Sequence, residues 1–340
     1  MKYKCIIVLF FACLSAKIPF AQTTVTILDS GKTTSLRGLS VVDDNVFWAS
    51  GSNGTVARSV NGGKTIQWLT VKGYAQRDFR DIEAIDSNTA IIMAIAEPAI
   101  ILKTRDAGKT WYKVFEDTSK GMFFDAMDFT DLYGIVIGDP VNSKMFIAET
   151  YDYGETWTKK DDLPLLDSGE AMFASSGTNS KALNTSTYKR MIVTGGLKSS
   201  VILLPVNRHL GNIRLLLPLV QGKESTGANS LAVYRKNMFV VGGDFSNDKD
   251  TVGNSAYSSD NGKTWKKPIT PPHGYRSCVE YITSQNLIAC GTSGIDISAD
   301  GGKNWQLISR QSFHVCQLAK NGSKVYLAGS NGKIAVLEIK

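Results

Sequence analysis

Three arginines stand at corresponding places in a repeated segment of this 340-residue chain, and their side chains suit charged-ligand binding. Arg37, Arg80 and Arg276 each stand at the start of a β-rich run. Acidic residues and one histidine occupy related places in other copies or in the turns that follow: Glu97, Asp139, Glu170, Asp244 and His314. Because guanidinium groups bind carboxylates through paired hydrogen bonds, this set favours an anionic ligand or a charged loop of a protein partner. The alternative interpretation is a ring of solvated polar residues.

Other reactive groups are few. The three histidines do not accompany a nucleophile-elbow glycine pattern, and no glycine-rich nucleotide fingerprint follows a strand and opens a helix. Beyond the first 21 residues the cysteines are Cys278, Cys290 and Cys316, without the spacing of a zinc site. One bridge between neighbouring strands and three buried thiols are the two alternatives. We expect no metal and no cofactor.

A repeat of about 46 residues sets where these groups lie. Five segments share one box, beginning at Ser59, Thr104, Thr150, Ser258 and Ser298. Their starts are spaced by 45, 46, 108 and 40 residues, so the long gap holds two units, one of which has lost its box. From Gln22 onward 319 residues remain, which divide into seven such units.

Each unit contains several short strands. In the first unit, residues 36–42, 46–51, 55–59 and 67–71 are rich in β-formers and separated by turn residues. Four short strands per unit predict an all-β fold, a single seven-bladed β-propeller over residues 22–340. The last unit has three strands, so residues 24–28 are expected to supply its fourth and close the ring. Aligning the inner strands puts seven residues at one level of the channel: Arg37, Arg80, Phe124, Glu170, Asn229, Arg276 and His314.

The boxes are interpreted as structural turns. The acidic or amide side chain accepts backbone N–H bonds across the turn, and the tryptophan packs beside it. The residues concerned are Asn61, Asp106, Asp152, Asp260, Asp300, Trp111, Trp157, Trp265 and Trp305. A calcium or ligand site is the alternative interpretation.

These segments resemble Asp boxes, or BNR repeats, of the form S/T-x-D-x-G-x-T-W. Sialidases, xyloglucan-active glycosidases, sortilin-type ectodomains and the photosystem II stability/assembly factor family carry them. The run from Leu36 to Val41, the run from Trp48 to Gly54 and the turn from Gly138 to Val141 resemble that last family most. The resemblance implies a non-catalytic scaffold that binds a protein or glycan at the channel mouth.

A secreted glycoside hydrolase is the alternative function. The resemblance to sialidases implies an arginine triad at Arg37, Arg80 and Arg276, with Glu170, Asp81 and Tyr275 nearby. Two carboxylates for sugar hydrolysis would come from Glu97, Asp139 and Glu170. The arginine-isoleucine-proline entry motif of sialidases is absent, and seven units fit the length better than six.

The N-terminus has the pattern of a signal peptide. A basic start is followed by an apolar run from Cys5 to Ala16 and a small-residue site near Ala21. We expect residues 1–21 to be removed and the mature chain to be secreted or periplasmic, monomeric and without a membrane span. Its net charge falls from +7 to about +4 because Lys2, Lys4 and Lys17 leave, so nucleic acid is not an expected partner.

Overall fold

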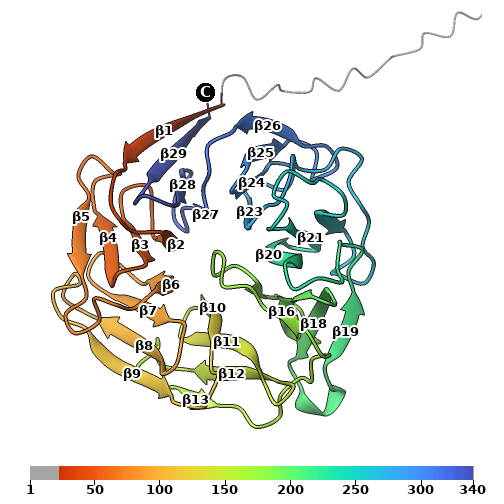
Figure 1. Ribbon diagram of the computed structural model, residues 1–340, viewed down its shortest axis with the longest axis horizontal. Coiled ribbons are helices and arrows are strands. Elements are labelled where there is room, and N and C mark those ends of the chain that lie inside the picture. Colours follow the sequence, from red (N-terminus) through yellow and green to blue (C-terminus); the bar gives the residue numbers. More distant parts are fainter. Residues whose placement is uncertain (1–22, 340) are drawn as a thin grey trace, which may run out of the picture.

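Seven small antiparallel sheets stand radially around a common axis (Figure 1). A computed structural model describes residues 23–339. The predicted seven-bladed all-β propeller is confirmed, and within those residues the helical content is one three-residue 3-10 turn, Arg208–Leu210. The expected signal peptide, residues 1–21, lies outside the described residues.

The first three blades follow the repeat closely. Blade 1 holds β2 (Leu36–Val41), β3 (Phe47–Gly51), β4 (Thr55–Ser59) and β5 (Gln67–Thr70). Blade 2 holds β6 (Phe79–Ala84), β7 (Ala90–Ala94), β8 (Ala99–Thr104) and β9 (Tyr112–Asp117). Blade 3 holds β10 (Phe124–Thr130), β11 (Tyr133–Val141), β12 (Lys144–Thr150) and β13 (Thr158–Lys159).

The remaining blades are less uniform. Blade 4 holds β15 (Ser180–Ala182), β16 (Tyr188–Val193), β18 (Ser200–Pro205) and β19 (Ile213–Leu216). Blade 5 holds β20 (Thr226–Tyr234), β21 (Asn237–Asp244) and β22 (Ser255–Ser258), with β14 (Glu170–Ala171) and β17 (Gly195–Gly196) added to its inner side. Blade 6 holds β23 (Cys278–Tyr281), β24 (Leu287–Gly291), β25 (Gly294–Ser298) and β26 (Gln306–Ser309).

The N-terminal strand closes the ring as predicted. Blade 7 consists of β27 (Val315–Leu318), β28 (Val325–Ala328), β29 (Ile334–Ile339) and β1 (Thr23–Asp29). Strands β1 and β29 pair antiparallel from Thr23↔Ile339 to Asp29↔Ile334. Because β1 comes from the other end of the chain, this pairing ties the first and last blades together and covers the edge of β29.

The Asp boxes are hydrogen-bonded turns. In the fourth box, Asp260 accepts bonds from the backbone N–H of Thr264 (3.0 Å) and from the hydroxyls of Thr264 (2.6 Å) and Ser258 (2.7 Å). The indole N–H of Trp265 donates to the Gly262 carbonyl at 3.0 Å. Asp106, Asp152 and Asp300 accept equivalent bonds. These partners occupy the carboxylate, in agreement with the interpretation of the box as a structural turn.

A β-bulge recurs near the start of the inner strands. The pairing shifts between Leu36 and Gly38, between Phe79 and Asp81, and between Phe124 and Ala126. The extra residues are therefore Arg37, Arg80 and Asp125. A bulge residue stands outside the strict in-and-out alternation of a strand, and these three side chains line the central channel.

One segment crosses the channel. The inner strand of blade 4 begins at Ser180 rather than near Glu170, and the segment before it reaches towards the centre of the ring (Figure 1). Ser176 Oγ donates to the Ser277 carbonyl at 2.7 Å, and Thr178 Oγ1 bonds to Ser230 Oγ at 2.7 Å. These contacts tie blade 4 to blades 5 and 6 and give the channel a floor.

The core lies between the blades. In the largest cluster, residues of blades 1, 6 and 7 pack together, with the Phe47 and Tyr326 rings 4.7 Å apart. The cluster contains the free thiols of Cys278, Cys290 and Cys316, all buried. Of the two alternatives for the cysteines, the structure therefore has three buried thiols and no bridge.

Candidate functional site

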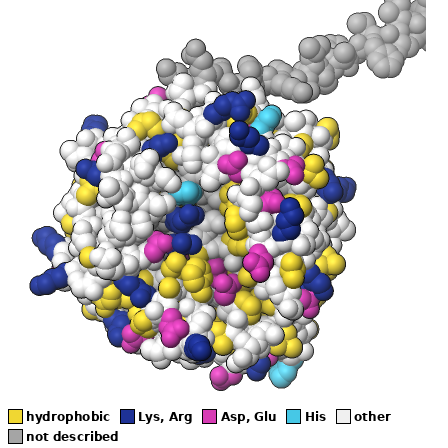
Figure 2. All heavy atoms as spheres, viewed as in Figure 1, with side chains coloured by type: hydrophobic (Ala, Val, Ile, Leu, Met, Phe, Trp, Pro, Cys, Tyr) yellow, Lys and Arg dark blue, Asp and Glu magenta, His cyan; other side chains and the backbone are white. Residues whose placement is uncertain are grey.

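A cavity of about 500 Å³ lies above the crossing segment, where the inner strands begin. Its charged and histidine side chains are Arg37, Arg80, Asp125, Asp139 and His314. Its apolar and aromatic ones include Met172, Phe123, Phe173, Phe245 and Tyr275. Figure 2 shows a hollow in the middle of this face, with basic, acidic and hydrophobic side chains around it. Its size is typical of ligand sites.

Two guanidinium groups stand on one side of this central cavity. Arg37 Nη1 donates to the Ser175 carbonyl of the crossing segment at 3.3 Å. Burial first, and then the nearby Arg80 charge, lower the pKa of Arg37 from its usual value. Arg80 is anchored by Asp78, with Nε and Oδ2 2.8 Å apart, and its guanidinium lies 5.9 Å from the centre of the Phe123 ring. Arginine stays ionised in proteins, so both groups offer fixed positive charge to a ligand.

His314 borders the same cavity as a neutral donor or acceptor. Its Nε2 lies 2.8 Å from Ser330 Oγ and 3.1 Å from Ser35 Oγ. Burial first, and then the charges of Arg37 and Arg80, lower the pKa of His314 to about 3. The imidazole is therefore uncharged at neutral pH, and the positive charge of this side of the cavity belongs to the arginines.

Two carboxyl groups lie in the cavity wall formed by blade 3. Asp139 Oδ1 accepts a bond from the Met172 N–H at 3.2 Å, and burial raises the pKa of Asp139 to about 6. Asp125 is fully buried. Burial first, and then the charge of Asp139, raise the pKa of Asp125 well above its usual value. The cavity thus holds a fixed positive region and an acidic region.

The third arginine of the expected triad does not reach the cavity. In blade 6, Cys278 pairs with Cys290 as Gly38 pairs with Ser50 in blade 1. This register puts Ser277, and not Arg276, at the position of Arg37. Arg276 is fully buried and donates to Asp296, and Ser277 lines the cavity instead. Because the register differs by one residue from the predicted one, the predicted ligand-binding residue Arg276 lies in the core.

The other expected acidic residues also lie outside the cavity lining. Glu170 is buried, accepts a bond from Thr194 Oγ1 at 2.5 Å and pairs with Arg214. Glu97 accepts a bond from the Gly121 N–H at 3.0 Å, and Asp244 pairs with Lys223 at 3.3 Å. A regular repeat predicts that every blade starts its inner strand at the same repeat position, but the inner strand of blade 4 starts only at Ser180.

The sequence reasoning missed Asp125 and the phenylalanines of the cavity. Phe124 had been aligned with Arg80, but the bulge between Phe124 and Ala126 makes Asp125 the equivalent residue. Phe173 lies in the crossing segment, and Phe245 follows Asp244 at the end of β21. The Phe245 ring packs edge-on against Phe173, with ring centres 5.8 Å apart. A bulge carries no sequence signal of its own here, so the one-residue difference was not visible.

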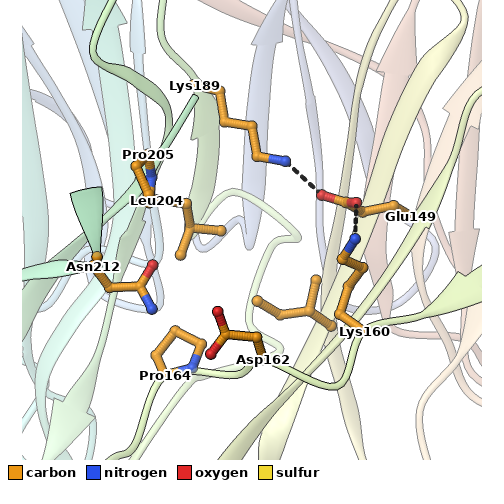
Figure 3. A pocket seen from close by; sticks show the side chains of 10 residues that line it. Glu149, Lys160, Asp162, Pro164, Lys189, Leu204, Pro205 and Asn212 are labelled. Carbon is orange, nitrogen blue, oxygen red and sulfur yellow. Dashed lines mark hydrogen bonds and ion pairs between the residues drawn. The ribbon is translucent and has the colours of Figure 1, made fainter. Parts of the chain in front are cut away.

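A second, smaller hollow of about 60 Å³ lies between blades 3 and 4 (Figure 3). Glu149 projects into it and is held by Lys189 at 2.7 Å and Lys160 at 3.1 Å. Burial opposes ionisation of Glu149, but the hydrogen bonds from Lys189 and Tyr133 lower its pKa to about 2. Because its carboxylate is fully paired and the space admits only a few water molecules, the central cavity is the stronger candidate.

Two further properties concern residues 23–339 alone. No group of three or more histidine, cysteine, aspartate or glutamate side chains in this range is placed to hold a metal ion. No helix in the same range is long and apolar enough to cross a membrane.

Known proteins resemble this chain in its box and its fold. A BNR/Asp-box repeat model matches residues 256–267, which contain Asp260. The structure of YCF48 bound to D1 peptide has a TM-score of 0.59 at 16% identity, covering 94% of this chain and 97% of that one. YCF48 from Cyanidioschyzon merolae has a TM-score of 0.57 at 16% identity, covering 92% and 98%. The Neurospora crassa Pan2 WD40 domain has a TM-score of 0.61 at 14% identity, covering 89% of each.

None of the curated proteins matches the chain significantly in sequence. The BNR/Asp-box match and the YCF48 structures confirm the predicted resemblance in the box and in the propeller fold. At identities this low the likeness to solved structures concerns the fold, and function has to be argued from the cavity.

Proposed function

We propose that this chain is a non-catalytic β-propeller scaffold whose central cavity binds a segment of a protein partner. One observation carries the proposal: Arg37 and Arg80 stand beside Phe123, Phe173, Phe245 and Tyr275 in one cavity of about 500 Å³. Fixed positive charge beside aromatic surface suits a peptide that carries a carboxylate and apolar side chains. The fold neighbour YCF48 has been solved bound to D1 peptide, which supports a peptide rather than a glycan as the ligand.

Panning a phage-displayed dodecapeptide library tests this function. We expect the wild-type chain to enrich peptides that contain Glu or Asp beside aromatic or aliphatic residues. An Arg37→Ala/Arg80→Ala variant should bind the enriched peptides at least tenfold more weakly. A Lys64→Ala/Arg310→Ala variant removes the same charge at exposed sites outside the cavity lining and should bind as the wild type does. Equal binding by all three proteins, or enrichment on a glycan array alone, contradicts the proposal.

We further propose that the chain is exported and acts as a monomer. The basic start and apolar run of residues 1–16, with a small-residue site near Ala21, support export. Expression in a Gram-negative host should yield a periplasmic protein whose mature N-terminus is Gln22, measured by intact-mass spectrometry. Light scattering after size-exclusion chromatography should give the monomer mass; retention of residues 1–21 or a dimer mass contradicts this part.

A glycoside hydrolase is the second candidate, favoured by the two carboxyl groups in the cavity. The raised pKa of Asp139, about 6, is what a general acid needs near neutral pH. Turnover of aryl-sialosides or β-glucans that is lost in an Asp139→Asn variant would establish this function. We expect no such turnover.

A further inference from the structure

The carboxyl group of Asp125 has no hydrogen-bond partner although it is fully buried in the cavity wall. Within residues 23–339, Asp125 is the one carboxyl group whose two oxygens are both buried and without a hydrogen-bond partner. The backbone amides of Asp139 and Ala174 both lie near it but outside hydrogen-bond geometry, and the Asp139 amide donates instead to the Phe123 carbonyl at 2.9 Å. Buried polar atoms are normally paired, so two unpaired oxygens beside an open cavity indicate a missing partner.

The groups around Asp125 define what that partner must be. Asp139 on β11 is a second carboxyl group, and Arg80 on β6 attracts Asp125 but is already bound to Asp78. An ionised Asp125 without a further cation would put a fully buried negative charge next to the half-buried carboxyl group of Asp139, which is costly. Burial and the charge of Asp139 therefore favour the protonated form of Asp125 in the free protein, and its two oxygens stay unpaired there.

We propose that Asp125 accepts a primary ammonium group of the bound segment, such as a lysine side chain, while Arg37 and Arg80 hold a carboxylate of the same segment. This inference rests on the proposed function of the cavity and adds that the ligand is dipolar. An ammonium group has three donors and one positive charge, so it pairs both Asp125 oxygens and offsets the charge of Asp139. A single neutral N–H donor would pair one Asp125 oxygen and leave the carboxyl proton in place.

Binding in this way releases the proton from the protonated form of Asp125. The Asp125 carboxylic acid and the ligand ammonium become a carboxylate–ammonium pair, and the displaced proton goes to the buffer. Asp139, the second carboxyl group of the cavity, has its pKa raised to about 6 and is largely ionised above pH 6.5. The pKa of His314 is about 3 and that of Tyr275 about 12, so both side chains stay uncharged between pH 6.5 and 8.5. The arginine side chains of the cavity remain cations in this interval. Affinity should therefore rise with pH across that interval.

Isothermal titration calorimetry with synthetic hexapeptides tests the inference. The probes are acetylated and amidated Gly/Ala peptides with one Glu and one Lys separated by one to four residues, and the same peptides with acetyl-lysine. We expect the best Lys peptide to bind the wild type at least tenfold more tightly than its acetyl-lysine partner. Measurements in two buffers of different ionisation enthalpy should show the release of about one proton at pH 7.5.

Asp125→Asn should reduce this preference to less than threefold while leaving the affinity for the acetyl-lysine peptide nearly unchanged. Asp161→Asn, at an exposed carboxylate, is the matched control and should keep the preference. Equal affinity for the two peptides overturns the dipolar ligand but not the cavity, whereas no binding by any peptide overturns both. Carbon-13 NMR of the Asp125 carboxyl gives an independent reading: an ionised group in the free protein at pH 7.5 would also overturn the inference.

Discussion

Arg276 and Asp296 form an ion pair that is fully buried in blade 6, with Arg276 Nε 2.7 Å from Asp296 Oδ2. The remaining donors of Arg276 reach the Tyr275 carbonyl (2.8 Å), Ser293 Oγ (2.8 Å) and the His273 carbonyl (3.1 Å). The guanidinium therefore holds the loop before β23 to the end of β24, and the wall of the cavity that includes Tyr275 depends on it.

Removing Arg276 should lower the stability of the fold. An Arg276→Ala variant leaves Asp296 buried with the backbone N–H and imidazole of His273 as its remaining hydrogen-bond partners, so we expect the free energy of unfolding to fall by about 3–5 kcal/mol. Urea unfolding followed by tryptophan fluorescence measures it. An Arg276→Met/Asp296→Asn variant should recover part of the loss, and a loss below about 1 kcal/mol in the single variant would contradict the structural role.

The Asp boxes should contribute stability that depends on acid. Asp260→Ala removes the bonds from Thr264 and Ser258, and we expect a loss of about 2 kcal/mol at pH 7. The hydrogen bond from the Thr264 side chain is the main reason why the pKa of Asp260 is lowered to about 2. The bonds therefore stabilise the fold above about pH 4, and this stabilisation is lost as pH falls towards 2.

Thermal unfolding of wild type and Asp260→Ala between pH 7 and pH 2.5 measures that contribution. The gap between the two should narrow below pH 4. Lys263→Ala, at an exposed position of the same box, should match the wild type at every pH, and a constant gap would show that Asp260 acts through packing alone.

His314 should make the fold less stable in mild acid. Its pKa is lowered to about 3, so between about pH 6.5 and pH 3 the unfolded chain takes up a proton that the folded chain refuses. This costs about 2 kcal/mol between pH 7 and pH 5. Buried carboxyl groups such as Asp125 act in the opposite direction, because their raised pKa favours the folded state at lower pH.

The difference between wild type and His314→Gln isolates the histidine from those groups. We expect the free energy of unfolding of wild type relative to this variant to fall by about 2 kcal/mol from pH 7 to pH 5. His209→Gln replaces an exposed histidine and should leave the pH dependence of the wild type unchanged. A pH-independent difference for His314→Gln would mean that the imidazole takes up a proton as readily in the folded protein as in the unfolded chain.

Replacing Gly177 in the crossing segment should destabilise the fold. Its φ is +68°, and a Cβ there would stand 2.3 Å from the Asp81 carboxylate. Gly177→Ala should therefore lower the free energy of unfolding by about 2–4 kcal/mol and weaken ligand binding, because Ser175 of the same segment lines the cavity. Gly121→Ala is the matched control, since its φ is +78° but nothing lies within 4 Å of the added Cβ; it should cost about 1 kcal/mol. Equal losses in both, measured by urea unfolding, would contradict steric exclusion at Gly177.

The sequence alone determined the architecture. A box such as that from Ser258 to Trp265 forms its hydrogen bonds within eight consecutive residues, so its spacing counts the blades before any tertiary contact is known. The strand limits of blade 1 and the closure by β1 followed for the same reason: alternation and turn residues are local properties.

The tertiary structure decided which side chains meet. The sequence predicts Arg37, Arg80, Asp139 and His314, which line the cavity, whereas the predicted Arg276 lies one residue away in register and is buried with Asp296. Asp125 lines the cavity because it is a bulge residue, and Phe173 lines it because its segment crosses the channel. Register and bulges are set by pairing between strands, and a shift of one residue exchanges the two faces of a strand. The composition of the cavity therefore follows from packing among seven blades and not from the repeat.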